Sequence, residues 1–210
     1  MKRENRIIGI TDIHGELGKL ESLLEKLDLM PDDTIVFMGD YIDRGKNSKG
    51  VIDKIISLGD FCKCVYLKGS HEYAYLNARK GDEYYKYLFW NYGGVQTVES
   101  YGSFENIYNV HGEFLESLLP YYETEDYFFI HAGLRPNIPL EEQQEEDFFY
   151  IRSEFYSHKT NFPKKIIFGH TEFDEPQVQA DKICIDTGCG KYPNAVLTAI
   201  ICPEETFVHS

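Results

Sequence analysis

The chain has 210 residues, more than one average domain and fewer than two. Hydrophobic residues make up 42% and charged residues 27%, a globular composition that excludes an intrinsically disordered chain. The formal net charge of −14 argues against nucleic-acid partners and against anionic membranes, because both need a basic surface. A small phosphate substrate is still compatible with this charge, since a metal cluster can reverse the sign of the potential in one cleft.

No segment of the sequence is typical of secretion, membrane insertion or thiol chemistry. The apolar run near the N-terminus, Ile7–Ile10, is too short for the core of a signal peptide. No stretch approaches the ~20 apolar residues that span a bilayer. The five cysteines form no C-x-x-C pair, which excludes zinc-ribbon and redox motifs. We therefore expect a cytoplasmic protein without membrane or nucleic-acid partners.

Short apolar runs alternate with helical patterns in the first third of the chain. The expected strands cover 6–11, 34–38 and 62–67. The expected helices cover 16–29 and 48–58, and another begins at His71. Leucines in the first helix recur at helical spacing. This strand–helix alternation predicts parallel strands joined by right-handed crossovers.

The middle of the chain, 81–122, is rich in aromatic residues, and we expect it to be helical. We interpret its aromatic side chains as core and cap packing, in preference to a stacking platform for bases. These side chains are Tyr84, Tyr85, Tyr87, Phe89, Trp90, Tyr92, Phe104 and Tyr108.

The later part of the chain is rich in short strands, which predicts an antiparallel or mixed sheet. The expected strands cover 127–130, 165–168, 183–185, 196–200 and 206–209. We interpret the charged stretch 141–147 as a solvated helix or loop face. The sequence contains no linker or repeat, so we expect a single domain over 1–210.

Polar residues follow the predicted strands at the points where they end. The first strand runs into Asp12 and His14, whose spacing places both side chains on one side of an extended chain. The second strand runs into Asp40, and the third into Ser70-His71. Because ligands of parallel α/β sheets bind at the carboxyl ends of strands, these residues are candidates for one site.

Four of the seven histidines lie at strand ends beside glycine, alanine or serine. One such histidine is best explained as structural, but four of them together with Asp12 and Asp40 indicate a metal site. The four are His14, His71, His131 and His170. The other three lack this context and are interpreted as structural: His111, His158 and His209.

In this order, the motifs resemble the calcineurin-like metallophosphoesterases, in particular the compact bacterial and phage form of the phosphoprotein phosphatase branch. The resemblance runs from Ile8 to about Cys189. It implies an α/β fold, a layered α-β-β-α sandwich with a dinuclear metal site at the carboxyl ends of the strands. The motifs are Asp12-Ile-His14-Gly, Gly-Asp40-Tyr-Ile-Asp43-Arg44-Gly, Gly-Ser70-His71-Glu, His131-Ala-Gly and Gly-His170-Thr.

The resemblance also assigns roles by position. It implies that Asp40 bridges two metals, with Asp12 and His14 on the first and Ser70 on the second. The full set of implied metal ligands is Asp12, His14, Asp40, Ser70, His131 and His170.

The same resemblance implies four catalytic residues. His71 would donate a proton to the leaving oxygen and would be oriented by Asp43. Arg44 and Arg152 would grip the phosphate oxygens, because the planar guanidinium matches phosphate in a bidentate way. We interpret Asp186, by contrast, as structural in its turn.

The chemistry of phosphoester hydrolysis agrees with these roles. The reaction needs a nucleophile, charge neutralisation and protonation of the leaving group. Two divalent metal ions could supply a bridging hydroxide and clamp the phosphoryl oxygens. Oxygen and imidazole ligands without cysteine fit Mn²⁺, Fe and Zn²⁺ without choosing among them, and we expect Mn²⁺ first.

Two positions depart from the family pattern. Ser70 stands where the family has asparagine, and a serine hydroxyl is a shorter and weaker ligand than an amide oxygen. The sequence leaves open a working natural variant, a weakened enzyme and a substitution introduced to trap a ligand. Thr11 stands where the family usually has glycine, which an extended backbone should tolerate.

Three functions follow from this interpretation. The first is a serine/threonine protein phosphatase, a phosphomonoesterase for phosphorylated proteins or small phosphoesters. The second is a symmetrical dinucleoside polyphosphate hydrolase, for which the short chain leaves little room for a nucleotide-specific insertion. The third is a metal- or phosphoprotein-binding module with little turnover. The presence of His71, Asp43, Arg44 and Arg152 together argues against the third.

Overall fold

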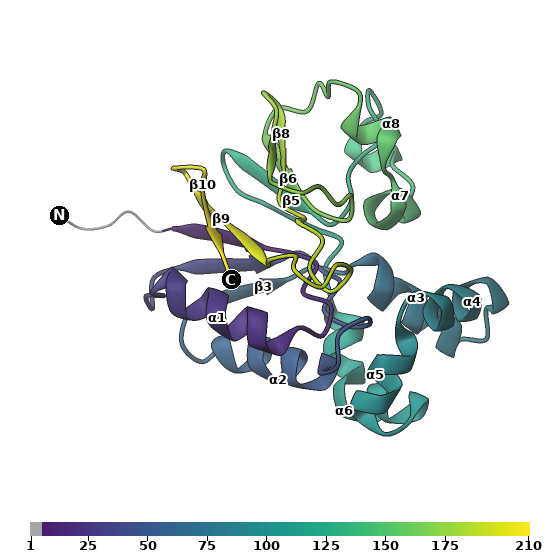
Figure 1. Cartoon of the computed structure of the whole chain (residues 1–210). Helices are drawn as coiled ribbons and strands as arrows, with labels where there is room; N and C mark the ends of the chain where they lie inside the picture. Colours follow the sequence, from purple (N-terminus) through teal and green to yellow (C-terminus); the bar gives the residue numbers. More distant parts are fainter. Residues whose placement is uncertain (1–5) are drawn as a thin grey trace.

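The computed structural model of the chain describes residues 6–210 and contains two five-stranded sheets packed face to face (Figure 1). The first sheet contains β1 (Ile7–Ile10), β2 (Thr34–Phe37), β3 (Lys63–Tyr66), β9 (Thr198–Cys202) and β10 (Thr206–His209). Its strand order is β10-β9-β1-β2-β3. The strands β1, β2 and β3 are parallel, as expected from their alternation with helices. The hairpin of β9 and β10 adds to the edge of β1 in antiparallel orientation.

The second sheet is mixed, as the sequence predicts for the later part of the chain. It contains β4 (Tyr121–Glu123), β5 (Tyr127–Ile130), β6 (Lys165–Phe168), β7 (Gln177–Val178) and β8 (Lys182–Cys184). Its strand order is β4-β5-β6-β8-β7. The three central strands are parallel, whereas β4 and β7 lie antiparallel at the two edges.

Apolar residues define the layers of the molecule. The facing sides of the two sheets bury a common core, to which β2 contributes Val36 and β5 contributes Phe129. Two helices cover the outer face of the first sheet, α1 (Leu17–Leu27) and α2 (Ser48–Leu58). The outer face of the second sheet is covered by α7 (Glu145–Tyr150) and α8 (Ser153–Tyr156), after a 3₁₀ turn, η1 (Leu140–Glu142). This arrangement confirms the layered α-β-β-α sandwich (Figure 1).

The segment between β3 and β4 forms four helices that extend beside the sandwich (Figure 1). They are α3 (Ser70–Arg79), α4 (Glu83–Asn91), α5 (Gly94–Tyr101) and α6 (Phe104–Ser117). Asp82 caps α4 by accepting from the backbone of Tyr84, and Ser103 caps α6 by accepting from Asn106. The helical prediction for 81–122 is therefore confirmed up to Ser117. Its end is wrong, because Tyr121 pairs with β5 in a strand.

The interpretation of the aromatic residues on α4 as packing residues is only partly confirmed. Tyr85 and Phe89 are buried in the core. In contrast, Tyr84, Trp90 and Tyr92 are 64%, 44% and 56% exposed. Tyr87 is exposed as well. A helix this short cannot bury an aromatic residue on every side, so one side of α4 faces the core and the others face solvent.

The interpretation of 141–147 as a solvated face is wrong at one residue. Six of its seven positions are exposed or half-buried, but Asp147 is buried. Its carboxylate accepts from Arg135 at 2.6 Å and 3.0 Å, a bidentate pair that compensates its burial. None of the helices within residues 6–210 combines the length and apolarity needed to cross a membrane.

A polar cluster distant from the strand ends links three helices. His111, where α6 is kinked, contacts Tyr101 through Nδ1 at 2.7 Å and Asp53 through Nε2 at 3.1 Å. Tyr101 belongs to α5 and Asp53 to α2. These contacts agree with the structural interpretation of His111.

We expect this cluster to make stability depend on pH. Burial lowers the pKa of His111, and Asp53 opposes this only in part. A histidine whose pKa is lowered by folding binds fewer protons when folded, so its stabilising contribution is lost as the pH falls below its ordinary pKa. Between about pH 7.5 and about pH 5.5, chemical denaturation should show a smaller loss of unfolding free energy for His111→Gln than for the unmodified protein. Equal losses in both proteins would contradict the prediction.

Candidate metal centre and catalytic site

Asp12 and His14 follow β1 at the carboxyl edge of the first sheet. Asp12 Oδ2 accepts from the Thr11 hydroxyl at 2.6 Å and from the His170 backbone N–H at 3.0 Å. Its second oxygen, Oδ1, lies 3.7 Å from His14 Nε2. The Thr11 side chain is thus accommodated at its unusual position and helps to orient Asp12.

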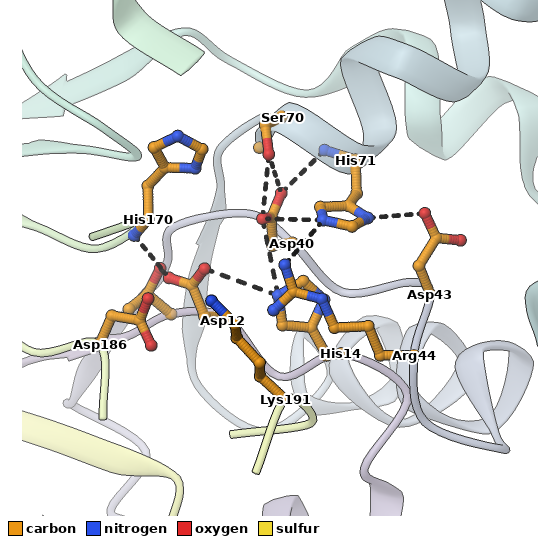
Figure 2. A network of polar contacts seen from close by, with 12 residues as sticks. Asp12, His14, Asp40, Asp43, Arg44, Ser70, His71, His170, Asp186 and Lys191 are labelled. Carbon is orange, nitrogen blue, oxygen red and sulfur yellow. Dashed lines mark hydrogen bonds and ion pairs between the residues drawn. The ribbon is translucent and has the colours of Figure 1, made fainter. Parts of the chain in front are cut away.

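Asp40, which follows β2, lies at the centre of the cluster (Figure 2). Its Oδ2 atom lies 3.7 Å from His14 Nε2 and 3.4 Å from His131 Nε2. Its Oδ1 atom accepts from the backbone N–H of His71 at 2.9 Å. Two groups of donor atoms within 4.8 Å of one another share this carboxylate, His14–Asp40–His71 and Asp40–His131–His170.

The histidine side chains fit a metal site by their own hydrogen bonding. Nδ1 of His14 contacts the Ile42 carbonyl at 3.0 Å, and Nδ1 of His131 contacts the Met38 carbonyl at 2.9 Å. A carbonyl only accepts, so Nδ1 carries the proton and the lone pair of the neutral ring is on Nε2. Nε2 of His14, His131 and His170 is buried without a hydrogen-bond partner among the described residues. Such atoms suit a cation.

The charge state of these histidines is also compatible with metal binding, which needs a neutral imidazole. Burial lowers the pKa of His14 and His170 well below the ordinary value, so both rings are neutral ligands at neutral pH. Burial opposes protonation of His131 too, but Asp40 outweighs it and raises the pKa of His131 to about 9. A metal ion would have to displace that proton.

Ser70 lies beside Asp40, at the first turn of α3. Its hydroxyl donates to the Asp40 carboxylate, with Oγ 3.1 Å from Oδ2 and 3.3 Å from Oδ1. The side chain is buried and lines the same cleft as His71 and His170. The structure therefore brings Ser70 to the cluster, in contact with the shared carboxylate.

His71 forms a buried relay with two residues from distant segments. Its Nδ1 donates to Asp43 Oδ2 at 2.7 Å, and Asp43 Oδ1 accepts from the Thr97 hydroxyl at 2.6 Å. Burial opposes the charged form of His71, but Asp40 and then Asp43 hold its pKa above the ordinary value. In this arrangement Nε2 accepts from Arg44 Nη2 at 3.3 Å and lies 3.8 Å from Asp40 Oδ2, and it would have to carry the second ring proton to act as a general acid.

The two arginines expected to hold phosphate differ in their surroundings. Arg44 is half-buried beside His71 and lines the cleft. Arg152 is exposed and lies at the rim, where it donates to the His170 carbonyl at 2.7 Å and to Glu172 at 3.3 Å. Glu172 also pairs with Lys191, so a second cation lies beside Arg152.

Glu72 is a residue of the site that the sequence analysis did not single out. Its buried carboxylate accepts from the backbone of Asp40, Tyr41 and Gly69 at 2.8, 2.8 and 3.0 Å. Burial raises the pKa of Glu72 to about 7. Its position in the first turn of α3, where glutamates often cap helices, is the signal that could have identified it. It positions the loop that carries Asp40.

Backbone strain is concentrated at the same loops. Among residues 6–210, nine non-glycine residues have positive φ, and six of them are site residues. Left-handed backbone is costly for such residues and persists where the surrounding structure enforces it, typically at functional sites. The six are Asp12, His14, Asp40, Asp43, Arg44 and His170.

A cleft of about 860 Å³ opens from this cluster. Ser70, His71 and His170 form its polar end, and the exposed side chains of α4 line the other. All sequence-predicted metal and catalytic residues therefore lie in or around one cleft edge. His111, His158 and His209 lie in none of the metal-compatible groups. Asp186 accepts from the Gly188 backbone at 2.9 Å and lies beside Asp12 (Figure 2).

Comparisons with known proteins agree with this geometry. A family model described as calcineurin-like phosphoesterase matches residues 5–206. The asymmetrical bis(5'-nucleosyl)-tetraphosphatase PrpE of Oceanobacillus iheyensis is 28% identical over 232 aligned positions, covering 95% of this chain and 89% of the relative.

Two solved structures share the fold. One, provisionally described as a diadenosine tetraphosphatase, has a TM-score of 0.75 at 22% identity and covers 100% of this chain and 94% of that chain. The other, a protein serine/threonine phosphatase from Saccharomyces cerevisiae, has a TM-score of 0.66 at 16% identity, with coverages of 100% and 80%.

Proposed function

Because the chain belongs to the calcineurin-like phosphoesterase family of metal-dependent phosphoester hydrolases, we propose that it hydrolyses a dinucleoside polyphosphate. The observation that carries the proposal is the large cleft, which joins the polar cluster around His71 to an aromatic surface on α4. Such a cleft can hold a phosphate chain and its nucleoside together. The PrpE relative, which aligns over 95% of this chain, supports the same substrate class.

The candidate metal ligands are Asp12, His14, Asp40, His131 and His170, with Ser70 beside Asp40. Two divalent metal ions at these residues would supply a nucleophile at neutral pH and neutralise phosphate charge. We propose Mn²⁺ as the first metal to test, because carboxylate and imidazole ligands without a thiolate are compatible with it, as they are with Fe and Zn²⁺.

The remaining residues act on the phosphate and on the leaving group. Arg44 orients the phosphate from inside the cleft, and Arg152 does so from the rim. The oxygen of water joins phosphorus as the bond from phosphorus to the leaving oxygen breaks. His71 Nε2 gives its proton to that oxygen, while Asp43 holds the ring by Nδ1.

The second candidate is a phosphatase for phosphoserine or phosphothreonine in proteins. The motifs around Asp40 and His71 favour it, because they resemble those of the phosphoprotein phosphatases. The cleft is also open at the rim beside Arg152, where an extended peptide could lie.

The test uses metal-stripped protein titrated with Mn²⁺, supplied in parallel with diadenosine tetraphosphate and a phosphoserine peptide. Hydrolysis of the dinucleotide with a higher kcat/KM is expected. Two ADP molecules as products indicate symmetrical cleavage, and ATP with AMP indicates asymmetrical cleavage. Preference for the peptide would overturn the proposal in favour of the second candidate. Metal binding without turnover of either substrate would favour a binding module.

We expect Ser70→Asn to strengthen binding of the second metal ion. An amide oxygen reaches further than a hydroxyl and is the better neutral ligand. The gain should be about 10-fold in Mn²⁺ affinity, the scale of ligand-environment effects at metal sites. Isothermal titration calorimetry of the metal-stripped proteins measures it, and Ser153→Asn, an exposed serine at the start of α8, is the control. Unchanged or weaker Mn²⁺ binding by Ser70→Asn would show that Ser70 does not lie at a ligand position.

A further inference from the structure

We propose that three exposed aromatic side chains, Tyr84, Trp90 and Tyr92, bind a nucleobase of the substrate by stacking. We refer to these three residues as the aromatic wall. The inference rests on the proposed function and deepens it, since it assigns the residues that select a nucleoside over other phosphate-bearing groups.

The aromatic wall is joined directly to the phosphate-binding end of the cleft. Arg44 donates its backbone N–H to the Gly93 carbonyl at 3.2 Å, next in sequence to Tyr92. Gly93 has a φ of 109°, and a Cβ atom there would lie 2.4 Å from Arg44 N, so only glycine allows this approach. Arg44 Nη2 in turn lies 3.3 Å from His71 Nε2, so the backbone next to Tyr92 is hydrogen-bonded to a residue of the catalytic cluster.

The structure also supports the indole of Trp90. Its ring stacks on Phe104 with centroids 5.9 Å apart and an interplanar angle of 28°. Phe89 packs against the same indole edge-to-face at 5.2 Å. Despite these contacts Trp90 is 44% exposed, so the ring is fixed in place while part of it faces the cleft and solvent. A fixed, exposed indole is a preorganised stacking surface.

Tyr150 adds another aromatic ring to the lining of the cleft. The Tyr150 ring lies 6.2 Å from the His170 ring, and its hydroxyl donates to the Ser70 carbonyl at 3.0 Å. Tyr85 lies between Tyr150 and Tyr84, with ring centroids 6.5 and 5.2 Å from them. Aromatic rings therefore continue from the metal cluster to the aromatic wall.

The distribution of charge selects the ligand class. The cations that line the cleft are Arg44, Arg152 and Lys191. Arg44 and Lys191 lie beside the cluster around Asp40 (Figure 2), and Arg152 donates to the carbonyl of His170. Among the described residues that line the α4–α5 side, none is charged. A ligand that is anionic at one end and flat and uncharged at the other matches this surface. A nucleoside polyphosphate has this form, and every base offers a π-face for stacking.

Trp90 makes the test direct, because it is the one tryptophan of the sequence. We would titrate Mn²⁺-loaded protein with ADP and, in parallel, with inorganic tripolyphosphate, and follow tryptophan fluorescence. Quenching by ADP without comparable quenching by tripolyphosphate is the expected result. Equal responses to both would overturn the proposal, as would quenching by a phosphoserine peptide alone.

Variants separate stacking from a general effect on the fold. Tyr92→Ala should raise the Kd for ADP about 10-fold, within the range found for removal of one base–aromatic stack. Tyr92→Phe retains the ring and should bind ADP as the unmodified protein does. Tyr87→Ala is the matched control, since Tyr87 is an exposed tyrosine of the same helix that does not line the cleft. Unchanged ADP affinity in both Tyr92→Ala and Tyr84→Ala would overturn the proposal.

Turnover distinguishes failure of this inference from failure of the proposed function. Base-dependent binding of ADP without hydrolysis of diadenosine tetraphosphate would support the aromatic wall and refute the proposed activity. Hydrolysis of diadenosine tetraphosphate with full ADP affinity in the wall variants would support the activity and refute the wall.

Discussion

Asp40→Asn is expected to release both metal ions and to lower kcat by more than about 100-fold. Changing a residue that only hydrogen-bonds to a metal ligand typically costs about 10- to 100-fold, and loss of the shared ligand itself should cost more. Asp40 Oδ2 lies within 3.8 Å of Nε2 of His14, His71 and His131, so both groups of candidate ligands depend on its charge. An amide keeps the size of the side chain but removes the negative charge between the two positions. Elemental analysis of dialysed protein measures the metal content.

Asp147→Asn is the matched control for this experiment. Asp147 is also a buried aspartate with strong hydrogen bonds, but its partner is Arg135 and it lies away from the cluster. Asp147→Asn is expected to weaken that pair and to retain both metal ions. Two metal ions bound to Asp40→Asn after dialysis would refute the bridging role.

His71→Asn is expected to lower kcat by about 10²- to 10⁴-fold for substrates with poor leaving groups, the usual contribution of general acid catalysis. The metal content should stay unchanged. A good leaving group such as p-nitrophenolate needs little protonation, so kcat for p-nitrophenyl phosphate should fall much less. Comparing the loss of kcat for a substrate with a poor leaving group with the loss for p-nitrophenyl phosphate reports proton donation separately from metal binding.

This experiment also resolves the position of His71 in the cluster. Its Nε2 lies near Asp40 and could be counted among the metal-compatible atoms, yet it lies beside the Arg44 guanidinium, which disfavours another cation there. His111→Gln, a change at a buried histidine paired with Asp53 elsewhere, is the control and should keep both kcat and metal content. Loss of metal from His71→Asn would show that His71 is a ligand.

The local elements were predictable because neighbouring residues encode them. The strands at 127–130, 165–168 and 206–209 and the helix at 48–58 have the bounds expected from their apolar patterns. The strands β4 and β7 were not predicted, since two or three residues form no periodic pattern. The hairpin of β9 and β10 was predicted as two strands but not assigned to the first sheet. Its pairing with β1 joins residues far apart in sequence.

The residues of the candidate site also divide into those that a local sequence motif identifies and those that only long-range contacts reveal. Asp12, His14, Asp40 and the histidines at 131 and 170 could be selected because strand ends bring such motifs to one edge. Thr97 and Glu72 could not, because their roles consist of contacts with Asp43 and with the Asp40 loop from other segments.

The sequence by itself determined the family, the alternation of strands and helices, and the residues that gather at the strand ends. Each of these features depends on motifs or apolar patterns formed by residues close together in the sequence. The tertiary structure decided which aromatic residues are buried. Tyr85 and Phe89 are buried, whereas Tyr84, Trp90 and Tyr92 are exposed and line the cleft, although all five are aromatic residues within one short segment. Burial is set by what packs against each side of a helix, and those partners come from distant parts of the chain.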